Sequence, residues 1–383
     1  MFQEKKNLFI PGPTPVAPGL LRVTSRPVIN HRGPEFHDLF GRVRASLAEV
    51  FQTKGKVFIL TGSGTSAMEA AVANTISPGD KVLVLVGGAF GERWAKLAET
   101  FGAQVERLSY PWGTAANPEW VREALAKDEG IKAVFATQNE SSTGVANDIK
   151  AIAEARGDHP ALLIVDAVSS FGAMELDMDG WGVDVVATAS QKCLMMPPGL
   201  AFVAFGERAW EAAAQAKTPR FYLDLRQYDA FAAIGETPFT PNVHLCFALE
   251  EAIGMLKREG LQAARERHLL MRDMVRAGLS ALGMELLVKD ERAASPTVTA
   301  VLGGDLDIPR FRRIAEDEFG FVLSGGQGEL KATSFRIGHM GYMLPVDMVG
   351  LLGVIELALT RAGKKTELGQ GVKAAQQVLL ERT

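Results

Sequence analysis

The sequence contains few cysteines and no long apolar run. Its two cysteines, Cys193 and Cys246, cannot form a disulfide framework, and they fit a reducing cytosol. No segment approaches the roughly 20 consecutive apolar residues that a membrane helix needs, and residues 1–7 lack the hydrophobic stretch of a secretory signal. We therefore expect a cytoplasmic protein with no membrane anchor.

Long runs of one charge and metal-binding motifs are also missing. The chain has 41 basic and 45 acidic residues and a net charge of −4, and such a balance argues against binding to nucleic acid or to a membrane surface. The six histidines show no spacing of the His-Glu-x-x-His kind, so we expect no metal site. A length of 383 residues, 47% of them hydrophobic, suggests two or three domains, with ample core in the largest.

Short apolar runs alternate with helical patterns over the first two-thirds of the chain. Strands that are buried on both faces read as near-continuous apolar runs, and helices between them imply a mostly parallel sheet. The sequence therefore predicts an α/β fold with a helix-covered central sheet. Its strands are expected near 57–61, 81–86, 105–108, 133–136, 162–166, 183–188 and 200–205.

The last third of the chain has a different pattern. After an irregular segment at 205–243, a long helical stretch at about 245–282 leads into short strands and two helices, which is typical of an α+β layer. We therefore expect an N-terminal arm at 1–20, a large domain at 21–260 and a small C-terminal α+β domain at 261–383.

Polar residues follow the predicted strands of the large domain. Ser63, Ser141, Asp166, Gln191 and Lys192 each come just after one of these strands. Active sites in parallel sheets lie beyond the C-terminal ends of the strands. The placement predicts that these side chains share one site.

Lys192 and Asp166 are the residue pair with the most specific chemistry. Asp166 closes the apolar run at 161–165, and Lys192 follows on a later loop. Pyridoxal phosphate (PLP) needs a lysine for its Schiff base and an acid that keeps its pyridine nitrogen protonated. A solvated surface lysine, and an acid that caps a helix or pairs with another lysine, are the alternatives.

Two further segments are compatible with phosphate and carboxylate ligands. The turn Thr61-Gly62-Ser63-Gly64-Thr65-Ser66 precedes an Ala-rich helix, where free N–H groups and the helix dipole favour phosphate, although an ordinary capped helix has the same pattern. Arg336 lies in an apolar strand, which suits either a ligand carboxylate or a structural ion pair. Nothing like Gly-x-Ser-x-Gly surrounds Ser141, which argues against a nucleophilic serine.

These segments, in this order, resemble the class V aminotransferases of PLP fold type I, especially the alanine–glyoxylate and serine–glyoxylate (serine–pyruvate) group. The resemblance covers nearly the whole chain. Its motifs are Pro11-Gly12-Pro13-Thr14-Pro15, His31-Arg32-Gly33-Pro34-Glu35-Phe36, Gly62-Ser63-Gly64-Thr65, Glu140-Ser141-Ser142-Thr143-Gly144, Asp166-Ala167-Val168-Ser169-Ser170, Ser190-Gln191-Lys192 with Pro197-Pro198-Gly199, Thr237-Pro238-Phe239-Thr240-Pro241 and Arg336-Ile337-Gly338.

The resemblance implies a role for each matching residue. Lys192 would hold PLP and move the proton, and Asp166 would pair with the pyridine nitrogen. The phosphate would be held by Ser63, Gly64, Thr65 and Gln191. Across a homodimer with shared active sites, Thr240 of the neighbouring subunit would also reach it, with Thr237 as a second candidate. Val168 would pack on the ring, Ser141 would lie near the ring hydroxyl or the substrate carboxylate, Arg336 would bind that carboxylate, and Gly12 would line a small substrate pocket.

One departure concerns the ring-stacking position. Relatives often have Trp there, whereas this chain has Phe90, which can stack but has no N–H. The resemblance implies transfer of an amino group from alanine or serine to glyoxylate or pyruvate. Ureidoglycine and 2-aminoethylphosphonate remain alternative donors, although no second cationic clamp for a phosphonate is evident. A cysteine desulfurase is a further alternative, but neither cysteine lies where its reactive thiol is needed.

Overall fold

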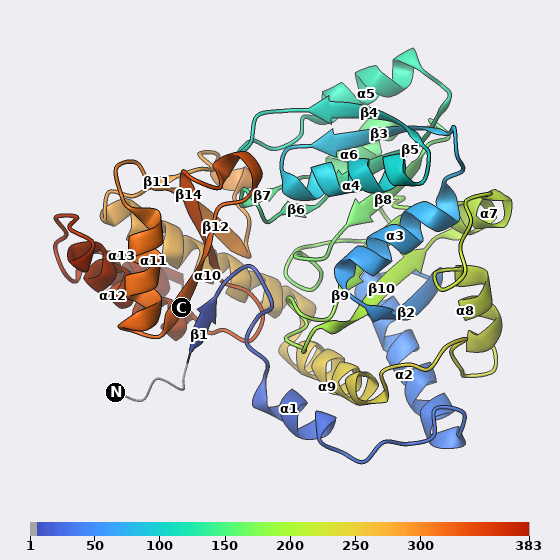
Figure 1. Cartoon of the computed structure of the whole chain (residues 1–383), viewed down its shortest axis with the longest axis horizontal. Coiled ribbons are helices and arrows are strands. Elements are labelled where there is room, and N and C mark those ends of the chain that lie inside the picture. Colours follow the sequence, from blue (N-terminus) through green and yellow to red (C-terminus); the bar gives the residue numbers. More distant parts are fainter. Residues whose placement is uncertain (1–5, 383) are drawn as a thin grey trace.

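A seven-stranded sheet and a five-stranded sheet organise the chain (Figure 1). The computed structural model describes residues 6–382, so residues 1–5 of the predicted arm and Thr383 lie outside it. The larger sheet has the strand order β2-β10-β9-β8-β5-β3-β4, and β10 alone runs antiparallel to its neighbours. The expectation of a mostly parallel sheet is therefore confirmed. Its strands are β2 (Lys56–Gly62), β3 (Lys81–Val86), β4 (Gln104–Ser109), β5 (Ile131–Thr137), β8 (Leu162–Asp166), β9 (Val185–Ala189) and β10 (Gly199–Phe205).

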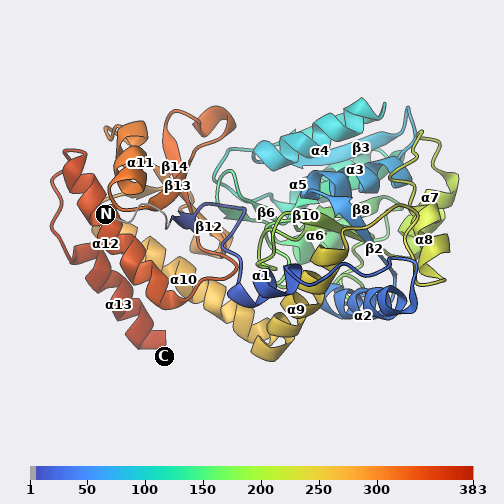
Figure 2. The same cartoon turned by 60° about the horizontal axis from the view of Figure 1, so that its bottom comes forward.

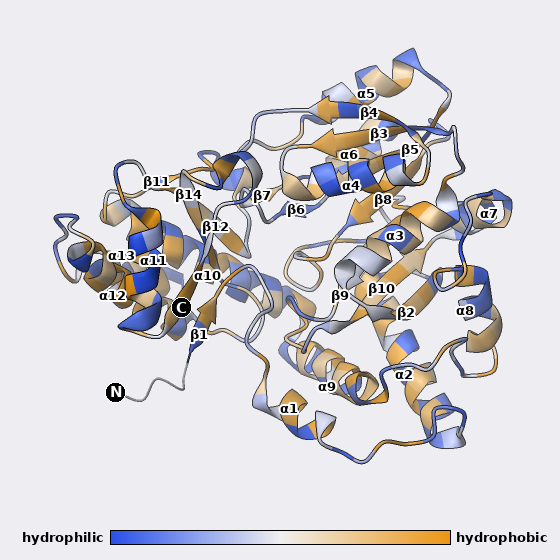
Figure 3. Ribbon diagram, in the orientation of Figure 1, coloured by the Kyte–Doolittle hydropathy of each residue, from blue (hydrophilic) through white to orange (hydrophobic). Residues whose placement is uncertain are grey.

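The central strands of this sheet are buried on both faces. Along β2, Val57 and Ile59 pack into one apolar cluster, whereas Phe58 and Leu60 pack into another on the opposite face. Successive side chains of a strand point to opposite faces, so a sheet covered on both sides needs a continuous apolar run. Figure 3 shows the central strands as predominantly hydrophobic.

Helices cover both faces of the larger sheet (Figures 1 and 2). Buried residues of one set share the cluster of Val57 and Ile59, and this set is α1 (Pro18–Thr24), α2 (Pro34–Phe51), α5 (Pro118–Lys127), α6 (Ile149–Arg156) and α9 (Val243–Glu259). The other face is covered by α3 (Gly64–Thr75), α4 (Ala89–Thr100), α7 (Glu207–Gln215) and α8 (Leu225–Ala232). Helix α6 begins after Asp148, whose side chain accepts a hydrogen bond from the Ala151 N–H.

The second sheet belongs to the C-terminal part of the chain, together with one strand from the N-terminus. Its order is β1-β13-β14-β12-β11, in which Leu8 of β1 lies opposite Val322 of β13. Part of the predicted arm is thus a strand of this sheet. The strands are β1 (Asn7–Phe9), β11 (Glu285–Leu286), β12 (Val298–Leu302), β13 (Phe321–Gly325) and β14 (Ser334–Gly338), and a separate two-stranded ribbon is formed by β6 (Asn139–Glu140) and β7 (Val145–Ala146).

The helical stretch expected at 245–282 is two helices. Gly260, with φ of 89°, separates α9 from α10 (Leu261–Ala281). Positive φ suits glycine, which ends α9 and lets the chain change direction. Helix α10 then packs with α11 (Ile308–Asp317), α12 (Pro345–Arg361) and α13 (Gln370–Arg382) beside the second sheet. None of the helices within residues 6–382 has both the length and the apolarity to cross a bilayer.

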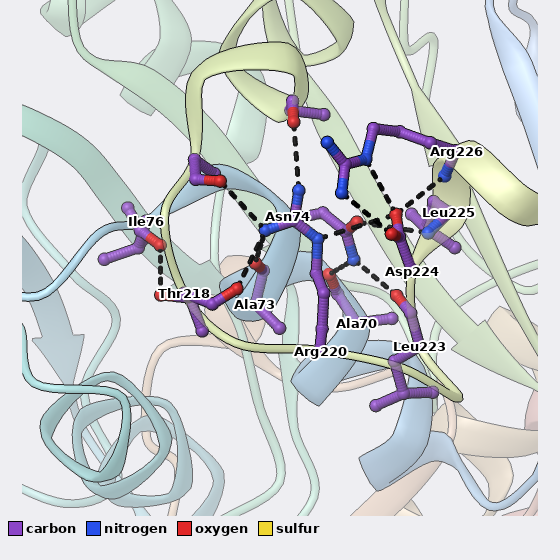
Figure 4. A network of polar contacts seen from close by, with 12 residues as sticks. Ala70, Ala73, Asn74, Ile76, Thr218, Arg220, Leu223, Asp224, Leu225 and Arg226 are labelled. Carbon is purple, nitrogen blue, oxygen red and sulfur yellow. Dashed lines mark hydrogen bonds and ion pairs between the residues drawn. The ribbon is translucent and has the colours of Figure 1, made fainter.

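A buried polar network anchors the C-terminal end of α3 (Figure 4). The Asn74 amide donates hydrogen bonds to the Ala70 and Leu223 carbonyls, and its oxygen accepts one from the Leu225 N–H. Arg220 donates to carbonyls of the same region, including that of Ala73 at 3.0 Å. Both ends of the Asn74 amide are paired, so the network fixes the irregular segment before α8 against α3. The buried Arg220 Nε has no hydrogen-bond partner and lies 3.7 Å from Asp224 Oδ1.

Candidate active site

The carboxyl ends of β2, β5, β8 and β9 meet at one edge of the larger sheet and bring the predicted residues together. A cavity of about 220 Å³ opens there. Among the residues predicted from the sequence, it is lined by Ser63, Gly64, Thr65, Phe90, Ser141, Asp166, Val168, Gln191 and Lys192. A larger hollow of about 550 Å³ lies in the C-terminal part between Gly283 and Lys364, and it contains none of them.

Lys192 lies on the loop after β9, at the wall of this cavity. Its ammonium group donates a hydrogen bond to the Pro11 carbonyl from the N-terminal segment. Burial lowers the pKa of Lys192 to about 8. An amine with that pKa is partly neutral at mildly alkaline pH, as a nucleophile or proton acceptor must be.

Asp166 is the last residue of β8 and is 3% exposed. Its carboxylate accepts a hydrogen bond from the Val168 N–H at 2.7 Å. Burial, assisted by the nearby Glu140, raises the pKa of Asp166 to about 6. The carboxylate forms no ion pair within 4 Å with a cation of residues 6–382, so a cationic ligand such as a pyridinium would relieve its desolvation.

The turn between β2 and α3 forms a polar cradle at the same edge. Ser63 precedes α3, but its side chain makes no capping hydrogen bond, so its hydroxyl and the N–H groups of Gly64 and Thr65 remain for a ligand. The Ser66 N–H already donates to the Ser63 carbonyl. A Cβ on Gly64 would lie 2.9 Å from the Val168 side chain. Glycine is therefore needed for this close approach. This donor set suits a phosphate group.

Arg336 lies on β14 and reaches the cavity region through Ser141. Its guanidinium donates hydrogen bonds to the Ser141 carbonyl, to Gln327 Oε1 and to the Gly325 carbonyl, at 2.9–3.0 Å. All three acceptors are neutral, and no carboxylate of the described chain pairs with Arg336 within 4 Å. Burial lowers its pKa to about 10. The structural ion pair considered from the sequence is absent from the described residues, and the guanidinium is available for an anionic ligand.

Gly12 lies against Lys192 from the N-terminal segment. It has φ of 121°, and a Cβ at this position would be 2.5 Å from Lys192 Nζ. The backbone of Gly12 is therefore so close to Lys192 that any side chain at position 12 would collide with the Lys192 amine. Gly12 and Arg336 do not line the 220 Å³ cavity itself, but both border residues that do.

Thr240 does not line this cavity. It is exposed, whereas Thr237 is buried and uses its hydroxyl to donate a hydrogen bond to the Phe239 carbonyl at 2.7 Å. A role for either threonine toward a second subunit remains a prediction.

Sequence reasoning missed three residues of this region. Asn139 lines the cavity with a buried Oδ1 that has no partner, while its amide nitrogen donates to Ser169 and Thr297. The buried Glu140 accepts hydrogen bonds from the Phe90 and Gly91 N–H groups at the start of α4. Arg93, also on α4, is the third. The position of Asn139 after β5 was the available signal, whereas the other two depend on how α4 packs.

Both thiols are buried away from reactive positions. Cys193 and Cys246 are buried, and burial raises the pKa of each thiol to about 12. A reactive cysteine needs a lowered pKa and access. The arrangement therefore opposes the cysteine desulfurase alternative.

A family comparison agrees with this geometry. The family model described as aminotransferase class-V matches residues 22–327. The chain belongs to the class-V aminotransferases. Its relatives include a protein named soluble hydrogenase, small subunit, from Synechococcus sp. (42% identity; 98% of this chain and 99% of the relative) and an uncharacterized aminotransferase from Methanocaldococcus jannaschii (42%; 98% and 98%). A serine–glyoxylate aminotransferase from Methylorubrum extorquens is 34% identical over 98% of this chain and 96% of its own length.

Solved structures of aminotransferases share the whole fold. Ureidoglycine–glyoxylate aminotransferase from Bacillus subtilis matches with a TM-score of 0.92 and 32% identity, covering 98% of each chain. Pyridoxamine–pyruvate aminotransferase from Mesorhizobium loti matches with a TM-score of 0.94 and 32% identity, covering 98% of this chain and 97% of that one. The aminotransferase fold expected from the sequence motifs is thus confirmed.

Proposed function

We propose that this aminotransferase uses PLP held by Lys192 to move the amino group of a small amino acid, alanine or serine, to glyoxylate or pyruvate. The observation that carries the proposal is one cavity edge with a lysine of lowered pKa, a buried acid without a cation, and a phosphate-type cradle. These residues fit the three parts of PLP: its aldehyde, its ring nitrogen and its phosphate.

Each residue has a distinct task in this proposal. Asp166 would hold a proton on the cofactor's ring nitrogen, Val168 and Phe90 would confine the ring, and Arg336 would bind the substrate's α-carboxylate. Lys192 Nζ would take the proton from the substrate's Cα and deliver it to the C4′ atom of the cofactor. PLP, when bound, supplies an electron sink for the electron pair that remains on the Cα atom when its proton is removed.

The choice of substrates rests on the size of the site and on the relatives. Gly12 brings backbone to within contact of Lys192, which favours small donors. Glyoxylate appears in the names of the Methylorubrum relative and of the Bacillus structure, which supports it as acceptor. Ureidoglycine and 2-aminoethylphosphonate stay as alternative donors. The name hydrogenase belongs to the Synechococcus protein, and no feature of this cavity favours a hydrogenase activity as a second candidate function.

Two further parts of the proposal concern the surroundings of the enzyme. We infer a homodimer in which the exposed Thr240 reaches the neighbouring subunit's phosphate site. We also infer a cytoplasmic location. Both rest on the sequence, and a mass measurement in solution together with Thr240→Ala binding data would test the first.

A spectral screen of half-reactions tests the activity. The purified protein with PLP would be mixed in turn with alanine, serine, aspartate and 2-aminoethylphosphonate, and loss of the cofactor's visible absorbance would be followed. We expect alanine or serine to discharge it fastest. Lys192→Ala should lose that absorbance and lower the rate by about 10²–10⁴-fold or more, whereas Lys150→Ala, an exposed lysine on α6, should behave as wild type. Retained rates in Lys192→Ala would overturn the proposal.

A further inference from the structure

Arg93 lies between the ring-stacking residue and the phosphate cradle. It belongs to α4 and lines the 220 Å³ cavity. Its guanidinium stands over the Phe90 ring, 4.6 Å from the ring centroid, and donates a hydrogen bond to Thr65 Oγ1 at 3.2 Å. The contact with Thr65 places a full positive charge at the start of α3.

The charge of Arg93 has no carboxylate partner. No ion pair within 4 Å joins it to an acid of residues 6–382. Arg93 is partly buried. Its positive charge lowers the pKa of Asp166, which opposes the larger effect of burial there. The same charge lowers the pKa of Lys192, in the same direction as burial. An unpaired guanidinium at a cavity wall is costly unless an anion joins it.

The remaining groups of the cradle are neutral. They are hydroxyls, an amide and backbone N–H groups, from Ser63, Gly64, Thr65 and Gln191. A phosphate monoester has a charge of about −1.5 to −2 at neutral pH. Helix dipoles and neutral donors contribute partial charges only, and among the cations of residues 6–382 it is Arg93 that donates a hydrogen bond to Thr65.

We propose that Arg93 is a cofactor-binding residue that pairs with the phosphate of PLP and selects the phosphorylated cofactor over its phosphate-free form. This inference rests on the proposed function. A substrate's second acidic group is the alternative ligand for Arg93. The contact with Thr65 favours the phosphate, because the substrate-carboxylate end is marked by Arg336 at Ser141.

Equilibrium binding to the apoenzyme tests the proposal without relying on turnover. Dissociation constants for PLP, for pyridoxal and for inorganic phosphate would be measured with wild type, Arg93→Gln, Arg93→Lys and the control Lys96→Gln, an exposed lysine on the same helix. We expect Arg93→Gln to weaken PLP about 10- to 100-fold, the range for charge-assisted hydrogen bonds, and to leave pyridoxal unchanged. Arg93→Lys should weaken PLP less, and Lys96→Gln should leave the dissociation constants of all three ligands unchanged.

The other outcomes separate the possible errors. Equal weakening of PLP and pyridoxal by Arg93→Gln would mean that Arg93 only supports Phe90, and unchanged PLP binding would mean that it is no phosphate ligand. A raised KM for acidic donors alone would assign it to the substrate. Each of these results overturns the inference while leaving Lys192 chemistry intact. Wild-type apoenzyme that binds no PLP would instead overturn the proposed function. If Arg93→Gln does not fold, the PLP-to-pyridoxal preference of Arg93→Lys decides.

Discussion

The guanidinium of Arg336 donates a hydrogen bond to the backbone oxygen of Ser141 at 2.9 Å, across 195 residues of sequence. The bond joins β14 of the smaller sheet to the turn between β6 and β7, the short ribbon that follows β5 of the larger sheet. It places an unpaired cation beside the cavity that contains Lys192 and Asp166. In the proposed function, the position of the smaller sheet would therefore determine where the substrate's carboxylate binds.

Arg336→Gln should lower kcat/KM for amino-acid donors by about 10- to 150-fold, the effect of losing one or more charge-assisted hydrogen bonds. The amide can still reach neutral acceptors, so the fold should survive. Steady-state kinetics with alanine and glyoxylate measure the effect. Arg310→Gln removes an exposed arginine from the same part of the chain and should leave kcat/KM unchanged. A matching loss there would show that net charge, and not the carboxylate contact, is responsible.

Gly12→Ala should prevent Lys192 from reaching its position. The new Cβ would lie 2.5 Å from Nζ and 2.7 Å from Cδ and Cε of Lys192, at a backbone φ of 121° that L residues rarely adopt. We expect kcat to fall by about 10²-fold or more, as misplacement near reacting atoms does, together with loss of the lysine-linked cofactor's absorbance. Gly19→Ala, on α1, adds a Cβ 3.7 Å from the Arg22 side chain, and should be neutral. Normal turnover in Gly12→Ala would contradict the proposed packing.

Much of the larger sheet could be predicted from the sequence because its strands are covered on both faces. The apolar runs at 81–86 and 162–166 match β3 and β8, and the acid at the end of β8 could be placed from the same pattern. Lys192 and the cradle before α3 followed from the rule that polar residues at strand ends share one edge. These inferences needed only local periodicity.

The residues that could not be predicted depend on tertiary packing. The α2 and α7 helices were not predicted, and β1 pairs with β13, which is more than 300 residues away. Arg93 is one charged residue among several on an amphipathic helix, and only the packing of α4 turns it toward Thr65. Glu140 is buried because α4 begins beside it, so its two hydrogen bonds to that helix have no local signature.

Gln52→Gly should stabilise the apoenzyme by about 0.5–1 kcal/mol, because glycine adopts the left-handed conformation without a Cβ penalty. Gln52 ends α2 with φ of 53° and ψ of 54°, and its side chain is exposed. The apparent melting temperature should rise by roughly 0.5–1.5 °C for a chain of 383 residues, with kcat unchanged. Gln52→Ala keeps the Cβ and should give no gain. An equal rise in Gln52→Ala would attribute the effect to the lost glutamine side chain.

Asp166→Asn should stabilise the apoenzyme at pH 7–8 while impairing turnover. Folding raises the pKa of Asp166 from 3.8 to about 6, so between these values the folded state binds more protons and stability falls as pH rises. The full cost, about 3 kcal/mol by the conversion of pKa to free energy, is present above pH 6 and disappears below pH 3.8. Asparagine is neutral throughout and its oxygen can still accept the Val168 N–H. Denaturant midpoints of both proteins should therefore differ at pH 8 and converge toward pH 4, and a difference that is constant with pH would exclude titration of Asp166 as its cause.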